Sequence, residues 1–509
     1  MNKLIAAGVL VVGLASIVGL KFYFTEQSND LTALTSDAGN FDHSIRVGVD
    51  SWAGYYPLCS KYIRSDLRNQ GILLQCINDS ANLDERFENL RRGELDLAVS
   101  TVDAYLTVGE QHRYPGTIVS VIDESKGGDA MVCYQDMVDS IDDLKTNPNL
   151  RVALTPDSPS EHLLRSLAVH FDVETFQSSG SWRVDANGSE DALNKLQSRS
   201  VDCAVVWEPD VTKARQLSGT KKVIGSEDTE RLIVDVLLSN REFIQKKPDV
   251  LKHVLSAYFD ALVYFKNNPN ALVVEMSKEA GLNKGAARQM LEGVKWASLS
   301  ENVFSWYSSV GHERSEYLVE SITSTLNILK SAGVLDSNPL PNQDVYAIIN
   351  STFVTELFDG NVTTTDSTQE ARAATYRNLS VEEWLALPNV GTLKVRKVQF
   401  ARSNGELSMN AKRMLDEASA DLSHYPNFRI MVKGHTGTYG DMDANRRLSE
   451  TRAKAVVRYL NIVHGIDESR MLAIGAGSDE PLAQMPNEGL RAYEARLPRV
   501  ELILKVGDR

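Results

Sequence analysis

The sequence predicts an α/β protein of two lobes, followed by a smaller α+β domain and preceded by an apolar N-terminal helix. Three observations support this fold class. Strand-like and helix-like stretches alternate from Ser44 onward, the uncharged run at residues 4–20 precedes them, and polar residues 359–378 separate a second compact unit. Alternating β and α segments are typical of parallel sheets covered by helices.

Length and composition limit the possible classes of protein. The 509 residues suffice for about three domains, at roughly 100–200 residues per domain. With 42% hydrophobic and 24% charged residues, the chain can bury ordinary cores, so global disorder is excluded. The 54 basic and 68 acidic residues give a net charge of −14. Nucleic acid is therefore not an expected partner, because its binding requires a basic surface.

The apolar run from Leu4 to Leu20 predicts a transmembrane anchor over residues 1–24. A helix of this length spans roughly 26 Å, slightly less than a hydrocarbon layer of about 30 Å. Lys21 and the aromatic residues that follow it suit the headgroup region. A cleaved signal peptide is the alternative, since Ala15 and Ser16 follow a short apolar stretch. In both cases the bulk of the chain is exported, and residues 25–43 form a polar linker.

The four cysteines leave two arrangements open. Cys59 and Cys76 can meet at one end of a strand–helix–strand unit, and Cys133 and Cys203 lie in apolar strand-like stretches. One or two disulfides and four buried thiols are equally compatible with these positions. The absence of a C-x-x-C pair argues against a zinc ribbon or a thioredoxin-type site.

Residues 44–350 are predicted to form the two lobes. The expected elements are strands at 45–49, 72–77, 97–100, 130–134, 151–154, 203–206 and 233–238, and helices at 57–69, 83–92, 160–171, 190–198, 250–265, 286–295 and 316–332. The strand at 233–238 is expected to return to the first lobe. Two α/β lobes joined by crossing strands place a cleft between them, which is a favoured ligand location.

A linker over residues 359–390 and a compact unit over 391–507 complete the chain. The unit is predicted to contain strands at 393–400, 428–434, 471–475 and 499–506, and helices at 409–423 and 444–461. On a wheel of the second helix, Arg452 falls among Leu448, Ser449, Val456 and Leu460. An arginine on an apolar face needs an acceptor. That acceptor is either a carboxylate of the same domain or a ligand carboxylate gripped by the guanidinium fork.

The segment around this arginine resembles the OmpA-like peptidoglycan-binding domain, whose signature runs GHTDxxGxxxxNxxLSxxRA. The matching residues are Gly434, His435, Thr436, Gly440, Asn445, Leu448, Ser449, Arg452 and Ala453. The resemblance implies non-covalent binding to the diaminopimelate-containing stem peptide of peptidoglycan, with Arg452 taking a carboxylate. His435, Thr436, Asn445, Leu448 and Ser449 are the other binding residues that it implies.

One signature position differs. The family's aspartate, which pairs with the ligand's ammonium group, is Gly437 here, and Asp441 or Asp443 is a candidate source of the missing charge. The family's later asparagine–arginine pair is also reduced, because residues 497–501 keep a single arginine.

Residues 44–350 resemble periplasmic solute-binding proteins of ABC transporters, in particular the group for nitrate, taurine, alkanesulfonates and thiamine precursors. The segments that carry the resemblance are 49–56, 97–105, 157–162 and 206–210. Each follows a predicted strand and is expected to face the cleft. The candidate solute-binding residues are Ser51, Trp52, Tyr55, Thr101, Asp103, Ser158, Ser160, Trp207, Glu208 and Asp235.

Five of these candidates also have a structural alternative. Ser158 and Ser160 precede a helix, so they either hold an anion or simply cap that helix. Trp207 and Glu208 either contact an organic cation or serve as a core aromatic and a surface carboxylate, and Asp235 is either a ligand contact or a strand-edge charge. Acidic and aromatic residues favour a neutral or cationic solute, whereas helix N-termini favour an anion. The sign of the solute's charge stays open.

Catalysis is not predicted. The sequence contains no Walker A, HExxH or GxSxG segment, and its nine histidines are scattered without metal-ligand spacing. Ser158 and His162 are four residues apart near a helix start, where capping is the usual role. No cofactor is therefore expected.

These observations favour a periplasmic protein held by one helix in the inner membrane, which binds a small solute by hinged closure and grips peptidoglycan. An ABC transporter permease is a candidate partner. The alternative is a structural linker between membrane and wall, whose lobes act as a protein-interaction surface.

Overall fold

The computed structural model describes residues 41–177, 180–279, 281–308, 316–360, 376–394, 398, 400 and 406–507. The predicted anchor at residues 1–24 lies outside these ranges, as does most of the linker that follows it. Among the described residues, no helix is long and apolar enough to cross a membrane.

The first lobe is built on a six-stranded sheet. In spatial order its strands are β11 (Val294–Trp296), β4 (Gly116–Ser125), β10 (Val234–Asn240), β3 (Leu97–Thr101), β1 (His43–Val49) and β2 (Ile72–Asn78). Strand β1 pairs in parallel with β2 and β3, whereas β10 runs antiparallel to β3 and β4. The predicted return of the chain to this lobe is therefore confirmed, with β10 as the returning strand.

The first lobe and the helical region that follows it contain most of the helices. They are α2 (Lys61–Asn69), α3 (Leu83–Arg92), α4 (Val102–Gln111), α9 (Arg241–Lys246), α10 (Pro248–Asn267), α11 (Pro269–Glu279), α12 (Lys284–Glu292), α13 (Leu299–Glu301), α14 (Tyr317–Ser331) and α15 (Thr352–Gly360). Helix α3 has the predicted bounds because the Asn82 side chain accepts from Glu85 N and Gly93 ends the helix in the left-handed region. The helix predicted at 286–295 ends earlier, since residues from Val294 join the sheet as β11.

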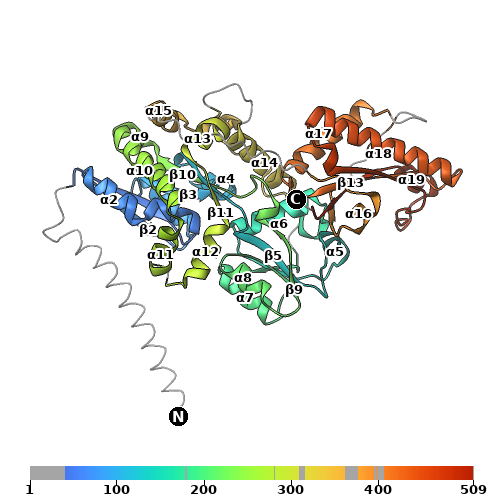
Figure 1. The fold of residues 1–509 in the computed structure, drawn as a ribbon, viewed down its shortest axis with the longest axis horizontal. Coiled ribbons are helices and arrows are strands. Elements are labelled where there is room, and N and C mark those ends of the chain that lie inside the picture. The colour runs from blue at the N-terminus through green and yellow to red at the C-terminus, as the bar shows by residue number, and fades with distance from the viewer. Residues whose placement is uncertain are drawn as a thin grey trace, which may run out of the picture.

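The second lobe has a five-stranded sheet in the order β7 (Arg183–Asp185), β6 (Val152–Leu154), β8 (Cys203–Trp207), β5 (Asp129–Tyr134) and β9 (Thr220–Gly225). Its helices are α5 (Ile141–Thr146), α6 (Pro159–His170), α7 (Ser189–Gln197) and α8 (Asp210–Arg215). The chain crosses between the lobes twice, after β4 and after β9, as Figure 1 shows. These two crossings, at residues 126–128 and 226–233, are called the hinge below.

The cysteines form two disulfides, Cys59–Cys76 in the first lobe and Cys133–Cys203 in the second. The first joins a residue just before α2 to strand β2, and the second joins strands β5 and β8. Of the two arrangements left open by the sequence, the bridged one is present.

The C-terminal unit is a four-stranded sheet with helices. Its elements are α16 (Val381–Ala386), β12 (Asn389–Thr392), α17 (Met409–Ser423), β13 (Arg429–His435), α18 (Met442–His464), β14 (Met471–Gly477), α19 (Leu490–Arg496) and β15 (Val500–Lys505), with the sheet in the order β12-β15-β13-β14. Half of the strand predicted at 393–400 lies outside the described residues; Leu393 and Lys394 are not in a strand, and the strand that pairs with β15 is Asn389–Thr392. Part of the predicted linker is also ordered, because a capping box of Ser380 and Glu383 starts α16, which buries Trp384.

The C-terminal unit packs against the second lobe (Figure 1). One hydrophobic cluster contains Ile141 and Phe171 of the second lobe together with Val390 and Tyr425 of the C-terminal unit. Polar contacts frame this cluster: Thr392 N donates to Asp142 Oδ1 at 3.0 Å and Lys145 Nζ donates to Thr392 O at 2.7 Å. A buried interface therefore joins these two parts of the chain.

Candidate binding sites

Three polar side chains form a row across the sheet of the first lobe where it meets the second. In the strand register Asp235 of β10 lies opposite Thr101 of β3 on one side and opposite Asp123 of β4 on the other. Directly opposed residues of antiparallel strands present their side chains to the same face. All three are buried. We call Thr101, Asp235 and Asp123 the acidic row.

Two aromatic residues of the segment after β1 contact the acidic row. Trp52 Nε1 donates to Asp123 Oδ1 at 3.2 Å, and the Tyr55 hydroxyl donates to Asp235 Oδ1. The indole also reaches the hinge, because a Cβ built on Gly128 would lie 2.2 Å from Trp52 Cη2. Trp52 thus lies between the row and the crossing to the second lobe. Ser51, another candidate in this segment, is exposed.

Burial changes the acidity of these carboxyl groups. It raises the pKa of Asp123 to about 8, and it raises the pKa of Asp235 well above its usual range, with the neighbouring Asp123 charge adding to the effect. It also raises the pKa of Asp129, the first residue of β5, to about 7, although Ser125 Oγ donates to that carboxylate at 2.7 Å. Three carboxyl groups that retain a proton to higher pH than exposed aspartates therefore lie at the boundary between the lobes.

The second lobe contributes the start of α6, which contacts α4 of the first lobe. Asp103 lies in the first turn of α4 and is buried. Ser158 Oγ donates to Thr155 O at 2.6 Å, so its hydroxyl does not cap the helix. Ser160 is fully buried, and within the described part of the chain its hydroxyl has no hydrogen-bond partner.

Trp207 is the last residue of β8, and Glu208 follows it at the same boundary. The Glu208 carboxylate is buried and accepts from Thr212 N at 3.2 Å and from Thr212 Oγ1 at 2.8 Å, which holds the first turn of α8. Trp207 is half-buried. The structure thus brings Trp52, Tyr55, Thr101 and Asp235 into one group, while Glu208 has a structural role in its own lobe.

Sequence reasoning missed Asp123 and Asp129. Strand β4 is buried along its whole length, so it shows none of the alternation that marks a half-buried strand. The signal that would have found Asp123 is a carboxylate directly after residues 118–122, a run in which Ser120 is the one polar residue.

The second candidate site lies on the C-terminal unit, around the loop between β13 and α18. Ser449 is fully buried, donates to Arg446 O and accepts from Gly477 N, both at 2.9 Å, so it packs α18 on the sheet. His435 is buried with Nε2 3.3 Å from Glu501 Oε2. Burial opposes ionisation of Glu501, but the adjacent imidazole of His435 and the nearby Arg499 lower its pKa to about 2.

Of the remaining motif residues, Thr436 is buried, whereas Asn445 is half-buried. Asn445 Nδ2 donates to Tyr439 O at 3.0 Å and orders the loop, Thr436 N donates to Gly477 O at 2.8 Å, and Leu448 is half-buried. Among the motif residues that the structure describes, Arg452 alone supplies a cation.

Arg452 is half-buried, and its guanidinium carbon lies 5.1 Å from the centre of the Phe400 ring. No carboxylate in the described ranges forms an ion pair with it, and its Nε is buried without a hydrogen-bond partner there. Burial lowers the pKa of Arg452. An internal carboxylate partner, the structural alternative for this residue, is thus not found among the residues described.

A carboxylate occupies the neighbourhood of Gly437, where the family signature has an aspartate. Glu494 of α19 accepts from Thr438 N at 3.2 Å and from Thr438 Oγ1. A Cβ on Gly437 would lie 2.9 Å from Glu494 Oε2. Asp441 instead caps α18 by accepting from Ala444 N at 2.8 Å, and Asp443 lies 3.9 Å from Arg446 Nη1.

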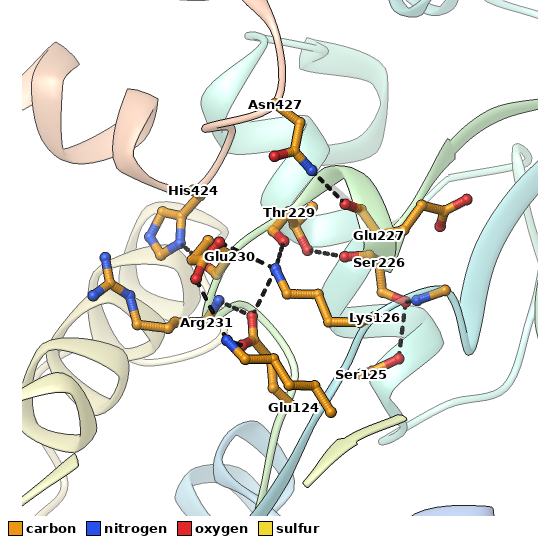
Figure 2. Close-up of polar contacts among 12 residues, drawn as sticks. Glu124, Ser125, Lys126, Ser226, Glu227, Thr229, Glu230, Arg231, His424 and Asn427 are labelled. Atoms are coloured by element: carbon orange, nitrogen blue, oxygen red, sulfur yellow. Dashed lines mark hydrogen bonds and ion pairs between the residues drawn. The ribbon is translucent and has the colours of Figure 1, made fainter. Parts of the chain in front are cut away.

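The hinge itself contacts the C-terminal unit, as Figure 2 shows. His424 Nδ1 lies 2.9 Å from Glu230 O, Glu230 N donates to His424 O at 2.8 Å, and Asn427 Nδ2 donates to Glu227 O at 2.8 Å. His424 Nε2 also lies 2.7 Å from Ser324 Oγ of α14.

Comparisons with known proteins divide the chain in the same way. The OmpA family matches residues 399–493. The peptidoglycan-associated lipoprotein of Pseudomonas aeruginosa is 32% identical over 98 residues, which are 19% of this chain and 57% of that protein. Outer membrane protein Omp38 of Acinetobacter baumannii is 30% identical over 101 residues, which are 20% of this chain and 28% of that protein. The chain thus matches little more than half the length of these relatives, or less.

Solved structures resemble the N-terminal part. The periplasmic aliphatic sulphonate binding protein SsuA of Escherichia coli is 15% identical, with a TM-score of 0.47 over 60% of this chain and 92% of that one. The desulfurization enzyme DszB is 11% identical, with a TM-score of 0.42 over 62% of this chain and 99% of that one.

Proposed function

We propose that the chain is a cell-envelope binding protein that attaches to peptidoglycan through its C-terminal unit and holds a small solute between its two lobes. In this proposal residues 1–24 anchor it in the inner membrane, residues 44–350 bind the solute and residues 391–507 bind the wall. The observation that carries the proposal is the guanidinium of Arg452, which lies on a motif matched by the OmpA family and pairs with no carboxylate of the described chain.

The charge of Arg452 supports the wall-binding part. A half-buried guanidinium without a carboxylate has lost part of its hydration and gained no ion pair in return, so an external carboxylate would bind it strongly. The stem peptide of peptidoglycan supplies such a group. The relative named peptidoglycan-associated lipoprotein supports this choice of ligand.

Replacing Arg452 by alanine is expected to weaken binding to purified sacculi by about tenfold or more, since a charge-assisted bidentate contact is lost. The fold should survive, because the substitution removes a partly desolvated charge and breaks no ion pair within the described residues. Co-sedimentation of the full chain with sacculi measures the effect. Arg458→Ala is the matched control, as Arg458 is exposed on the same helix. Equal sedimentation of Arg452→Ala and the parent would show that this guanidinium is not the anchor.

We further propose that Glu494 supplies the carboxylate that faces the ligand's ammonium group in place of an aspartate at position 437. Its two hydrogen bonds from Thr438 hold the carboxylate in the β13–α18 loop and leave acceptor positions for a ligand. Glycine at position 437 leaves room for that carboxylate, since any Cβ there would crowd it.

Glu494→Gln is accordingly expected to weaken sacculus binding severalfold, and Gly437→Asp in the Glu494→Gln background is expected to restore most of it. Gly437→Asp alone should bind poorly, because two carboxylates would then compete for one place. Asp443→Asn is the control for a nearby exposed charge. Parent-like binding by Glu494→Gln would remove this residue from the site.

The solute-binding part is supported by the convergence of Trp52, Tyr55, Thr101 and Asp235 at the boundary of two lobes joined by a two-stranded hinge. Hinged closure around a ligand is the mechanism that this architecture allows, with no covalent step. An ABC transporter permease is the proposed recipient of the solute. Native mass spectrometry of the chain purified from its own host, without denaturation, tests this part through a co-purified small molecule. A consistently empty protein would favour the alternative, a membrane-to-wall linker whose lobes contact another protein.

A further inference from the structure

The basic residues around the lobe boundary already have carboxylate partners. Arg86 pairs with Asp50 and Asp79, and Lys126 and Lys295 both pair with Glu124. Farther into the second lobe, Arg165 and Arg183 share Glu161. These cations are therefore neutralised within the protein and are poorly placed to attract an anionic solute.

The buried acids of the boundary, in contrast, have no basic partners among the described residues. Asp103, Asp123, Asp129, Glu208 and Asp235 are each at most 6% exposed, and no lysine or arginine in the described ranges forms an ion pair with any of them. Three of them (Asp103, Asp123 and Asp235) belong to the first lobe, and Asp129 and Glu208 belong to the second. Burial of several ionised carboxylates without a cation is costly, which favours retention of protons among these acids in the solute-free protein, whereas a bound cation would favour their ionised form.

Two unpaired hydroxyls are independent evidence of an unfilled polar site. Thr101 Oγ1, in the acidic row, is buried and has no hydrogen-bond partner in the described part of the chain. Ser160 Oγ, at the start of α6, is likewise buried without a hydrogen-bond partner in the described part of the chain, and α6 contacts α4, the helix that carries Asp103. Buried hydroxyls in native proteins are normally hydrogen-bonded, so their orphaned state indicates a missing ligand group.

The aromatic residue beside the row has the chemistry to accept a cation. Trp52 contacts Asp123 through Nε1 and extends its six-membered ring to Gly128 of the hinge. Indole is the strongest cation–π acceptor among the side chains. A cation held between the lobes would thus meet carboxylates and an aromatic face together.

From these contacts we infer that the solute is an organic cation, carrying an alkylammonium or guanidinium group that binds Asp103 and the acidic row beside Trp52. The inference rests on the proposed solute-binding function and fixes the class of its ligand. The proposed ligand class differs from the aliphatic sulphonate that the name of SsuA gives for that protein.

Isothermal titration and thermal unfolding of the full chain test the inference with two panels at equal ionic strength. Putrescine, agmatine and choline form the cationic panel; taurine, methanesulfonate and nitrate form the anionic panel. At least one cation should bind and raise the melting temperature by mass action. Asp103→Asn should weaken that binding by about tenfold. Glu110→Gln, on the exposed face of the same helix α4, should leave it unchanged.

The other outcomes separate the two proposals. Binding of an anion and of none of the amines would overturn the cationic class and leave solute binding intact. Amine binding that Asp103→Asn and Asp235→Asn both leave unchanged would overturn the site. If no compound of the two panels bound, this would count against solute capture itself and favour the linker role.

Discussion

Arg86→Met is expected to lower the free energy of unfolding of the first lobe by about 3–5 kcal/mol, the usual cost of breaking a buried ion pair from one side. Arg86 is 1% exposed. Its Nε donates to Asp79 Oδ2 at 2.7 Å, its Nη2 lies 3.1 Å from Asp50 Oδ2, and its Nη1 donates to Val99 O at 3.0 Å. Methionine fills similar volume but leaves two carboxylates facing each other without a cation.

The pKa of Asp79 indicates how strongly the pair depends on the arginine. Burial already raises this pKa even though Arg86 opposes the shift. In the variant both carboxylates must either stay charged in a low-dielectric site or take up a proton, and both alternatives reduce stability. Asp50 also accepts from Trp52 N at 2.9 Å, so the loss should loosen the segment that holds the aromatic part of the solute site.

Urea unfolding followed by circular dichroism and tryptophan fluorescence measures the effect. Arg92→Met is the matched control on the same helix, since Arg92 is exposed and its ion pair with Glu88 is superficial. Such pairs contribute roughly 0–1 kcal/mol. A loss in Arg86→Met no larger than in the control would mean that the buried cluster contributes little to the stability of the lobe.

Much of the lobe architecture could be predicted from the chain because its periodicity is local. The strand at 72–77 and the helix at 83–92 were predicted from the local residue pattern, and in the structure Asn82 and Gly93 fix the two ends of that helix. Strand β4 was not predicted because both of its faces are buried, and Asp123, which lies on it, was therefore missed as well. The acidic row depends on the order β4-β10-β3, which only the assembled sheet reveals.

The C-terminal motif located its site but did not assign every role. Ser449 and His435 match the signature, yet Ser449 hydrogen-bonds the backbone and His435 faces Glu501. Glu494 could not be predicted, since it reaches Thr438 from 56 residues away along the chain, through the placement of α19. Local spacing predicts which residues share a helix face, whereas a charge supplied by another element requires the tertiary structure.

The docking of the C-terminal unit on the hinge was also not predictable, since a polar linker suggested an independent module. His424 joins three parts of the molecule: it hydrogen-bonds the hinge at Glu230, approaches Ser324 of α14 and stacks on His170 of the second lobe at 5.5 Å. The hinge segment at residues 226–233 is thus covered by the unit proposed to bind the wall. Opening of the lobes would have to move this contact, so the proposed solute capture and the proposed wall attachment involve the same interface.

Acidification from about pH 6.5 to about pH 4 is expected to weaken this docking through His424. Burial lowers the pKa of His424 to about 4; the hydrogen bond to Glu230 opposes the shift, and the charge of Arg231 adds to it. An unfolded histidine titrates near 6.5. Between the folded and the unfolded pKa, the histidine is protonated in the unfolded chain but not in the folded one. The free energy of unfolding therefore falls as the pH falls. The difference between the two pKa values corresponds to a loss of about 3 kcal/mol in the free energy of unfolding from this one group.

His424→Gln separates this effect from the titration of other groups. The variant should be less stable than the parent at pH 7.5, because the stacked ring and one of its hydrogen bonds are lost, but the difference should shrink toward pH 4.5. His253→Gln, at an exposed position of α10, should follow the parent at every pH. Hydrogen exchange of residues 226–233 at the two pH values reports on the contact itself. If parent and His424→Gln lost protection over that segment equally on acidification, the buried imidazole would not be the group that makes the docking sensitive to pH.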